Sequence, residues 1–150
     1  MKSIKGDLIH LAQEGQFDLI VHGCNCFCTM GAGIAKQIRS QFPQAWEADR
    51  ATVSGDKSKL GSYSKACINT PSGRLHVINA YTQYNYSGDG VLVDYDAVAK
   101  VFSALKKQFS GQRIGYPKIG AGLAGGDWKI ISSIIDSALA EETHTLVELW

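Results

Sequence analysis

Two glycine-rich segments of the 150-residue chain each stand between an apolar run and an amphipathic one. The first is Met30-Gly31-Ala32-Gly33-Ile34-Ala35. Glycine lets the backbone approach a ligand closely, and a helix beginning near Gly33 would present free N–H groups and a partial positive charge that suit a phosphate. The other interpretation is a tight turn that lets a helix pack closely on a sheet. The phosphate interpretation depends on what faces this segment.

The second glycine-rich segment is Ile119-Gly120-Ala121-Gly122-Leu123-Ala124, followed by Gly125. It satisfies the dinucleotide pattern G-x-G-x-x-G, but only one more helix and strand fit before Trp150, so no second nucleotide-binding half can follow. The first segment is not a Walker A loop, because it lacks the Gly-Lys-Ser/Thr ending. We therefore predict that main-chain amides of the two segments face each other across a single pyrophosphate.

Four polar side chains are placed where they could assist such a site. Asn25 could donate to and accept from ribose hydroxyls, or it could form a turn. His22 could act as general acid or base, or be a structural residue. Asp127 could orient water at a ribose, but capping of the last helix is the favoured interpretation. Asp7 could accept a hydrogen bond from the exocyclic amine of adenine, or cap the helix that follows it.

The alternating Cys24, Cys26 and Cys28 invite a zinc interpretation. Tetrahedral zinc sites usually space the two ligands of a pair two to four residues apart, and they need a second pair, which the scattered histidines do not provide. We therefore expect structural thiols and no metal. No cofactor is expected either.

The apolar pattern predicts alternating strands and helices. Phe17 to His22 is a mostly apolar run that is typical of a strand buried on both faces, and Thr70-Pro71-Ser72-Gly73 is expected to be a hairpin turn. Expected strands are Ile4–Asp7, Phe17–His22, Tyr63–Asn69, Leu75–Ala80, Ile114–Lys118 and Thr145–Leu149; expected helices follow Asp7 and Ala32, contain Val98 to Phe109, and contain Ile131 to Ala138. The region 46–60 is expected to hold a short helix and a loop. This order indicates one α/β domain over residues 1–150, with a mixed sheet covered on both faces.

Composition narrows the class of function. The chain is 45% hydrophobic and 19% charged, with a formal net charge of +1 and no Lys/Arg run longer than two residues. Nucleic-acid binding as the main activity is therefore not expected, although backbone amides could still hold a small anion. The first residues contain no apolar signal core and no stretch approaches 18 apolar residues, so we expect a cytoplasmic protein that does not span a membrane and keeps its thiols reduced. We also expect a monomer.

The motifs together resemble those of macrodomains. Gly6-Asp7-Leu8-Ile9 is similar to their adenine-binding corner, His22-Gly23-Cys24-Asn25 with residues 30–35 to their distal-ribose and phosphate loop, and residues 119–124 to their second phosphate loop. The resemblance covers essentially the whole chain. It implies a three-layer α/β/α fold with a mixed, mostly parallel sheet of about six strands, and ADP-ribose as the ligand. Within the superfamily, the chain is most similar to the ADP-ribose 1″-phosphate phosphatase type and the related terminal ADP-ribose glycohydrolase type.

This resemblance implies binding by Asp7, Leu8 and Ile9, by Asn25, and by both glycine segments, with His22, Asn25 and Asp127 as catalytic candidates. It also exposes a departure. The glycohydrolase type has a lysine shortly after the fourth strand and an aspartate in the second loop, where this chain has Ala80-Tyr81 and Ala124, so hydrolysis through a lysine adduct is in doubt. The expected activity is hydrolysis of ADP-ribose 1″-phosphate to ADP-ribose and phosphate. The alternatives are removal of mono-ADP-ribose from a modified molecule and non-catalytic binding of ADP-ribose. Tyr81 and Tyr84 could pack on the ribose or adenine.

Overall fold

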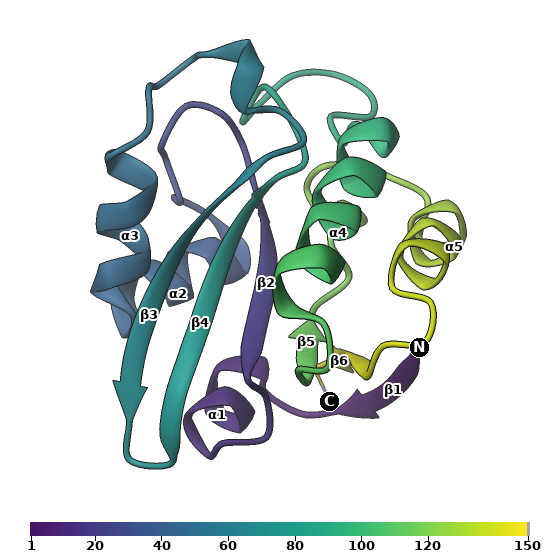
Figure 1. Cartoon of the computed structure of the whole chain (residues 1–150). Coiled ribbons are helices and arrows are strands. Elements are labelled where there is room, and N and C mark those ends of the chain that lie inside the picture. The colour runs from purple at the N-terminus through teal and green to yellow at the C-terminus, as the bar shows by residue number, and fades with distance from the viewer. Residues whose placement is uncertain (150) are drawn as a thin grey trace.

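The computed structural model describes residues 1–149, which fold into a central sheet with helices on both faces (Figure 1). The strands are β1 (Lys2–Lys5), β2 (Leu19–Cys24), β3 (Tyr63–Thr70), β4 (Gly73–Tyr81), β5 (Ile114–Tyr116) and β6 (His144–Glu148). The helices are α1 (Leu8–Gln13), α2 (Gly33–Gln41), α3 (Pro43–Arg50), the 3₁₀ helix η1 (Lys57–Lys59), α4 (Tyr95–Phe109) and α5 (Trp128–Ala138).

The six strands form one mixed sheet in the order β1-β6-β5-β2-β4-β3. All neighbouring pairs are parallel except β3 and β4, which form the expected hairpin with Thr70 paired to Gly73. The prediction of a three-layer, mostly parallel α/β fold is thus confirmed. Because β2, β4 and β5 run the same way side by side, the loops that follow them all emerge at one edge of the sheet.

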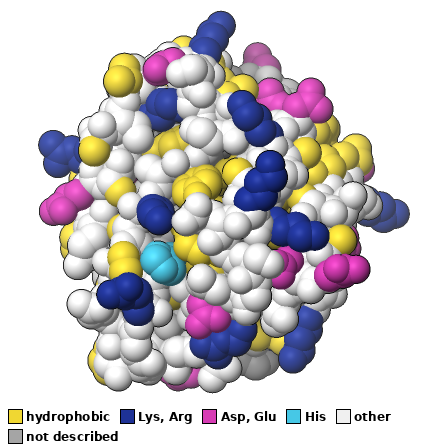
Figure 2. Space-filling model, in the orientation of Figure 1, with side chains coloured by type: hydrophobic (Ala, Val, Ile, Leu, Met, Phe, Trp, Pro, Cys, Tyr) yellow, Lys and Arg dark blue, Asp and Glu magenta, His cyan; other side chains and the backbone are white. Residues whose placement is uncertain are grey.

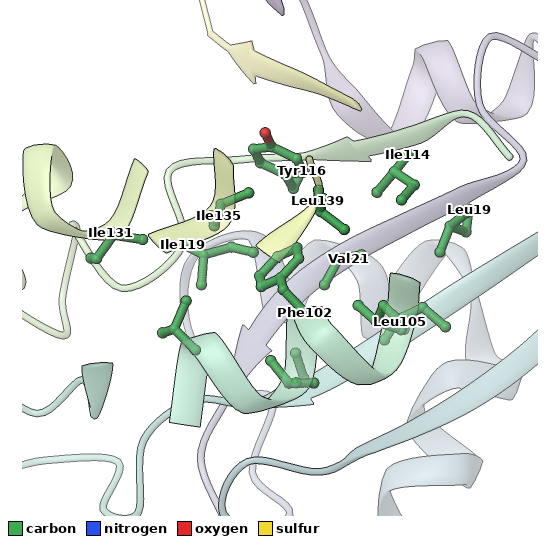
Figure 3. Packing of buried hydrophobic residues seen from close by; sticks show 14 of the residues in the cluster. Leu19, Val21, Phe102, Leu105, Ile114, Tyr116, Ile119, Ile131, Ile135 and Leu139 are labelled. Atoms are coloured by element: carbon green, nitrogen blue, oxygen red, sulfur yellow. The ribbon is translucent and has the colours of Figure 1, made fainter. Parts of the chain in front are cut away.

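Two hydrophobic cores hold the layers together, one on each face. The first lies under α4 and α5, where Phe102 and Leu105 of α4 meet Val21 of β2 (Figure 3). The second lies under α1, α2 and α3 and contains Ile20, the neighbour of Val21. Successive residues of β2 therefore point into opposite cores, which explains why this strand is apolar without alternation.

Several element boundaries differ from the expected ones for identifiable reasons. β1 covers Lys2–Lys5 and not Ile4–Asp7, because Asp7 leaves the sheet to cap α1. β5 ends at Tyr116, before Pro117, which has no N–H to continue a ladder. The helix expected within 46–60 begins earlier, at Pro43, directly after α2, because proline suits the first position of a helix.

The surface and helices give two further observations. Figure 2 shows Lys and Arg side chains interspersed with Asp and Glu on the face that it presents. Among residues 1–149, no helix has the length and apolar character needed to cross a membrane.

Candidate functional site

A cavity of about 610 Å³ opens at the edge of the sheet where β2 and β5 end. Pockets of this size accommodate small organic ligands and cofactors. Both glycine-rich segments line it, since each follows one of these two adjacent parallel strands. The residues in its wall from these segments are Met30, Gly31, Ala32, Gly33, Ile34, Ala35, Ile119, Gly120, Gly122, Leu123 and Ala124.

The first segment presents the N-terminus of α2 to the cavity. Ala32 precedes the helix with extended backbone and no side chain caps the first turn, so its amides are not taken up by a capping group. The loop before α2 contains two residues with left-handed backbone angles, which are unusual for residues other than glycine. They are Cys28, with a φ of 58°, and Met30, with a φ of 38°. Such strain is frequent where a loop is shaped for a ligand. The arrangement suits an anion at the helix N-terminus.

The second segment is a compact glycine loop. Gly120 has a φ of +75°, and a Cβ there would lie 2.6 Å from Val93, so only glycine fits. Main-chain bonds from Gly126 N to Gly120 O (2.7 Å) and from Gly125 N to Gly122 O (3.0 Å) close the loop. Ala121 alone of the expected residues 119–124 is not in the cavity wall, because its side chain packs toward the core under α4 and α5.

Asn25 is the one predicted catalytic residue that lies in the cavity wall. Its Oδ1 accepts from the N–H of Phe27 (2.8 Å), and its Nδ2 donates to Thr29 Oγ1 (2.7 Å). It therefore forms the turn that was the alternative interpretation, while the second Nδ2 hydrogen and the remaining Oδ1 lone pair stay available to a ligand. Both expectations for Asn25 are compatible with this geometry.

His22 is not part of the cavity wall, and its position does not fit the expected acid–base role. The side chain is 0% exposed, and Nε2 lies 2.6 Å from Asn79 Oδ1. Burial lowers the pKa of His22 from 6.5 to about 4, against the opposing hydrogen bond with Asn79. The ring is thus a neutral structural element between β2 and β4. The sequence could not distinguish this role, since the preceding residues of the strand are equally apolar in either case.

Asp127 also lies outside the cavity wall and serves as the helix cap that was the favoured interpretation. Its Oδ1 accepts from the N–H of Lys129 (2.9 Å) at the start of α5, and its own N–H donates to Tyr95 Oη (3.1 Å). A catalytic role for Asp127 is therefore not part of the site proposed below.

We predict that Asp127→Ala lowers the free energy of unfolding by about 1 kcal/mol, because the first turn of α5 loses its cap. ADP-ribose affinity should stay within about twofold, since the side chain does not reach the cavity. Urea denaturation and calorimetric titration measure the two quantities, with Asp127→Asn as the control that keeps a capping oxygen. Unchanged stability together with a loss of ADP-ribose affinity would show that Asp127 contributes to the binding site.

The residues expected to bind adenine lie apart from the main cavity. Asp7 and Ile9 line a neighbouring cavity of about 410 Å³ between α1 and α2. Oδ1 of Asp7 accepts from the N–H groups of Ile9 (3.0 Å) and His10 (3.2 Å), so the expected capping role is present. Leu8 lines neither cavity because its side chain is buried in the core under α1 to α3. A ligand contact by Leu8 could only be made by its main chain.

Some wall residues were not anticipated from the sequence. Asp49 reaches the cavity from α3, and Tyr86 and Gln83 reach it from the loop after β4. Lys118 also contributes, with its Nζ 2.7 Å from Glu148. Polar residues in polar helices and loops carry no periodic signal, so only their position in space identifies them.

Tyr81 and Tyr84 do not fulfil the expected packing on a ligand. Tyr81 is buried and its hydroxyl donates to Asp49 Oδ1 (2.7 Å). Tyr84 donates to the carbonyl of Gly55 (2.7 Å) and packs edge-on against Phe27. Neither lines the cavity, whereas the exposed Tyr86 does.

The cysteines are free thiols. Burial raises the pKa of Cys24 and of Cys26, which makes both poor nucleophiles at neutral pH. Cys28 donates to the carbonyl of Asp49 (3.2 Å) and so ties the β2–α2 loop to α3. These contacts are structural.

The fold and the cavity define a three-layer α/β/α domain whose pocket lies between two glycine loops at the carboxyl ends of parallel strands. A model of the Macro domain family matches residues 21–135. The chain belongs to the Macro domain family.

Three relatives each align with 91% of this chain. An uncharacterised 17.5 kDa protein of Enterobacteria phage T4 is 39% identical over 142 residues, covering 91% of this chain and 88% of that protein. An ADP-ribose 1″-phosphate phosphatase of Lodderomyces elongisporus is 25% identical and covers 91% of each chain. A DNA ADP-ribosyl glycohydrolase of Mycobacterium tuberculosis is 24% identical over 91% of this chain but only 38% of its own length. Among solved structures, the macrodomain of Thermus aquaticus DarG matches with a TM-score of 0.74 at 21% identity, over 98% of this chain and 96% of that one, and so supports the fold.

Proposed function

We propose that the protein binds ADP-ribose with its diphosphate between the two glycine loops. The observation that carries this proposal is the shared cavity, into which the N-terminus of α2 and the loop 119–124 both project. Uncapped amides from two sides can neutralise a diphosphate without basic side chains, which agrees with a net charge of only +1. Asn25 then lies at the distal ribose, and the cavity bounded by Asp7 and Ile9 takes the adenine.

We further propose hydrolysis of ADP-ribose 1″-phosphate. Water attacks phosphorus, the bond from phosphorus to the ribose oxygen breaks, and the products are ADP-ribose and inorganic phosphate. Such a transfer needs mainly positioning and charge neutralisation, so it does not require the lysine that Ala80-Tyr81 replaces. A relative of similar length, aligned along 91% of each chain, carries the name of this activity.

A second candidate is removal of ADP-ribose from a modified macromolecule. One observation favours it: the cavity wall includes two exposed apolar side chains, Leu123, which is 82% exposed, and Tyr86. A bulky group attached to the distal ribose would find apolar surface there. The relatives named DNA ADP-ribosyl glycohydrolase make DNA one such group.

Three assays on the purified chain separate the candidates: calorimetric ADP-ribose binding, phosphate release from ADP-ribose 1″-phosphate, and ADP-ribose release from ADP-ribosylated protein and DNA. We expect binding together with phosphate release. Asn25→Ala should slow phosphate release up to about tenfold, because a neutral hydrogen bond to a ribose hydroxyl is worth about 0.5–1.5 kcal/mol. Binding without any release would leave a reader of ADP-ribose, and release from DNA or protein alone would select the second candidate.

A further inference from the structure

Asp49 is a buried carboxylate in the wall of the proposed ADP-ribose cavity. It is 1% exposed, lies near the end of α3 and is among the residues that line the cavity. Its Oδ1 accepts the hydroxyl proton of Tyr81 (2.7 Å). No group within residues 1–149 hydrogen-bonds its Oδ2. A buried carboxylate oxygen without a protein partner is costly and therefore calls for an explanation.

A chain of hydrogen bonds fixes the orientation of this carboxylate. Asn79 Nδ2 donates to Ser64 Oγ (3.0 Å) and to a main-chain carbonyl of α3, so its Oδ1 is the acceptor for His22 Nε2. Ser64 Oγ lies 2.8 Å from the Tyr81 hydroxyl, which donates onward to Asp49. Because each member has a defined partner, Asp49 is held with Oδ1 toward Tyr81 and with Oδ2 unbonded by any of the described residues. The network includes His22, which explains why that residue is polar although it is buried.

The charge around Asp49 keeps it usable as a base. Burial raises the pKa of Asp49 above its usual 3.8, while the Tyr81 hydrogen bond and the positive charge of Lys59 oppose that rise. Lys59 donates to the carbonyl of Cys26 (3.0 Å) and lies 3.5 Å from Cys28 Sγ. The titratable groups that face Asp49 from its neighbouring elements are Tyr81 of β4, Lys59 of η1, Cys24 of β2, and Cys26 and Cys28 of the β2–α2 loop.

We propose that Asp49 Oδ2 holds the attacking water and accepts its proton, a role that rests on the hydrolysis proposed above. The water oxygen forms the new bond to phosphorus, and the bond between phosphorus and the ribose oxygen breaks. One water proton passes to Asp49 and later to solvent, and the departing ribose oxygen takes a proton from solvent. Asp49 thereby acts as a general base, a role for which His22 was one candidate in the sequence.

The test compares Asp49→Asn with the wild-type protein. Asparagine keeps an oxygen that can accept from Tyr81, so the network survives, but it cannot take a proton from water. We expect kcat for phosphate release to fall at least about a hundredfold, with ADP-ribose Kd within about threefold and an unchanged melting temperature. Asp96→Asn, which makes the same chemical change at an exposed position of α4, is the control and should keep full activity.

A pH profile separates catalysis from a structural role. Wild-type kcat/KM should rise with pH through an acid limb set by Asp49, and Asp49→Asn should lose that limb. Tyr81→Phe removes a hydrogen bond that favours the charged carboxylate, so its limb should move to higher pH. A purely structural Asp49 would change the melting temperature in these variants and leave the position of the limb where it was.

The outcomes are distinguishable. Full turnover in Asp49→Asn overturns the role of Asp49 and leaves the proposed hydrolysis standing, and so does a loss of ADP-ribose affinity equal to the loss of turnover. If Asp49→Asn does not fold, the pH profile of Tyr81→Phe is the test. A move of the acid limb to higher pH supports the role of Asp49, and an unmoved limb overturns it. The wild-type protein could also bind ADP-ribose but release no product from ADP-ribose 1″-phosphate, ADP-ribosylated protein or ADP-ribosylated DNA. That result overturns both the proposed hydrolysis and the role of Asp49, and it leaves the proposed ADP-ribose binding in place.

Discussion

Gly122→Val is expected to weaken ADP-ribose binding at least about a hundredfold while the fold is retained. A Cβ at Gly122 meets no atom within 4 Å, and its φ lies outside the left-handed region, so a side chain fits the free protein without strain. The same side chain would project where the loop 119–124 lines the cavity. It would hold a diphosphate away from the amides, at a cost of about 3 kcal/mol if two hydrogen bonds to a charged group are lost.

Calorimetric titration and thermal unfolding measure this effect. Gly122→Ala should give an intermediate affinity because it adds one methyl group, and Ala140→Val, at an exposed position outside the cavity wall, should bind like the wild type. Gly120 is unsuitable for this test, since its left-handed backbone and its contact with Val93 would damage the loop itself. Undiminished affinity of a folded Gly122→Val protein would mean that the diphosphate lies elsewhere.

Acidification should destabilise the protein through His22. The native pKa of this residue is about 4, below its usual 6.5, so between these values the unfolded chain binds a proton that the native chain does not. Stability from this group is therefore fully present above pH 6.5, is lost as the pH falls toward 4, and changes little below that. At about 1.4 kcal/mol per pH unit, the loss is about 3 kcal/mol.

Denaturant titrations at intervals between pH 7.5 and 4 follow this loss. His22→Gln is the matched variant, because it keeps a donor for Asn79 and has no titrating ring. Between pH 7.5 and pH 4, the free energy of unfolding of this variant should fall by about 3 kcal/mol less than that of the wild-type protein. This difference does not depend on the stability of the variant at pH 7.5. The pKa values of His76 and His144 are also lowered by burial, but both residues are present in each protein and cancel in the difference. Equal slopes would show that His22 is not the buried neutral group described above.

Local pattern was sufficient for most of the fold. The apolar run of β2, the period of α4, the Pro-Ser turn of the hairpin and the two glycine segments each depend on residues close together in sequence, so their positions could be predicted. Other strand boundaries, such as those of β2 and β4, differ by about two residues from the expected ones, and the differences at β1, β5 and α3 depend on where a cap or a proline ends one element and begins the next. The glycine loops could also be paired in advance, because loops after parallel strands meet at one edge of a sheet.

By itself, then, the sequence determined the family, the layers and the two loops that enclose the cavity. The tertiary structure decided which polar side chains reach it. His22 and Asp49 illustrate the reason: a strand-end histidine and a helical aspartate have the same local pattern whether they face a ligand or the core. Their roles follow from long-range packing of β2, β4 and α3, which buries the ring against Asn79 and brings the carboxylate to the cavity wall.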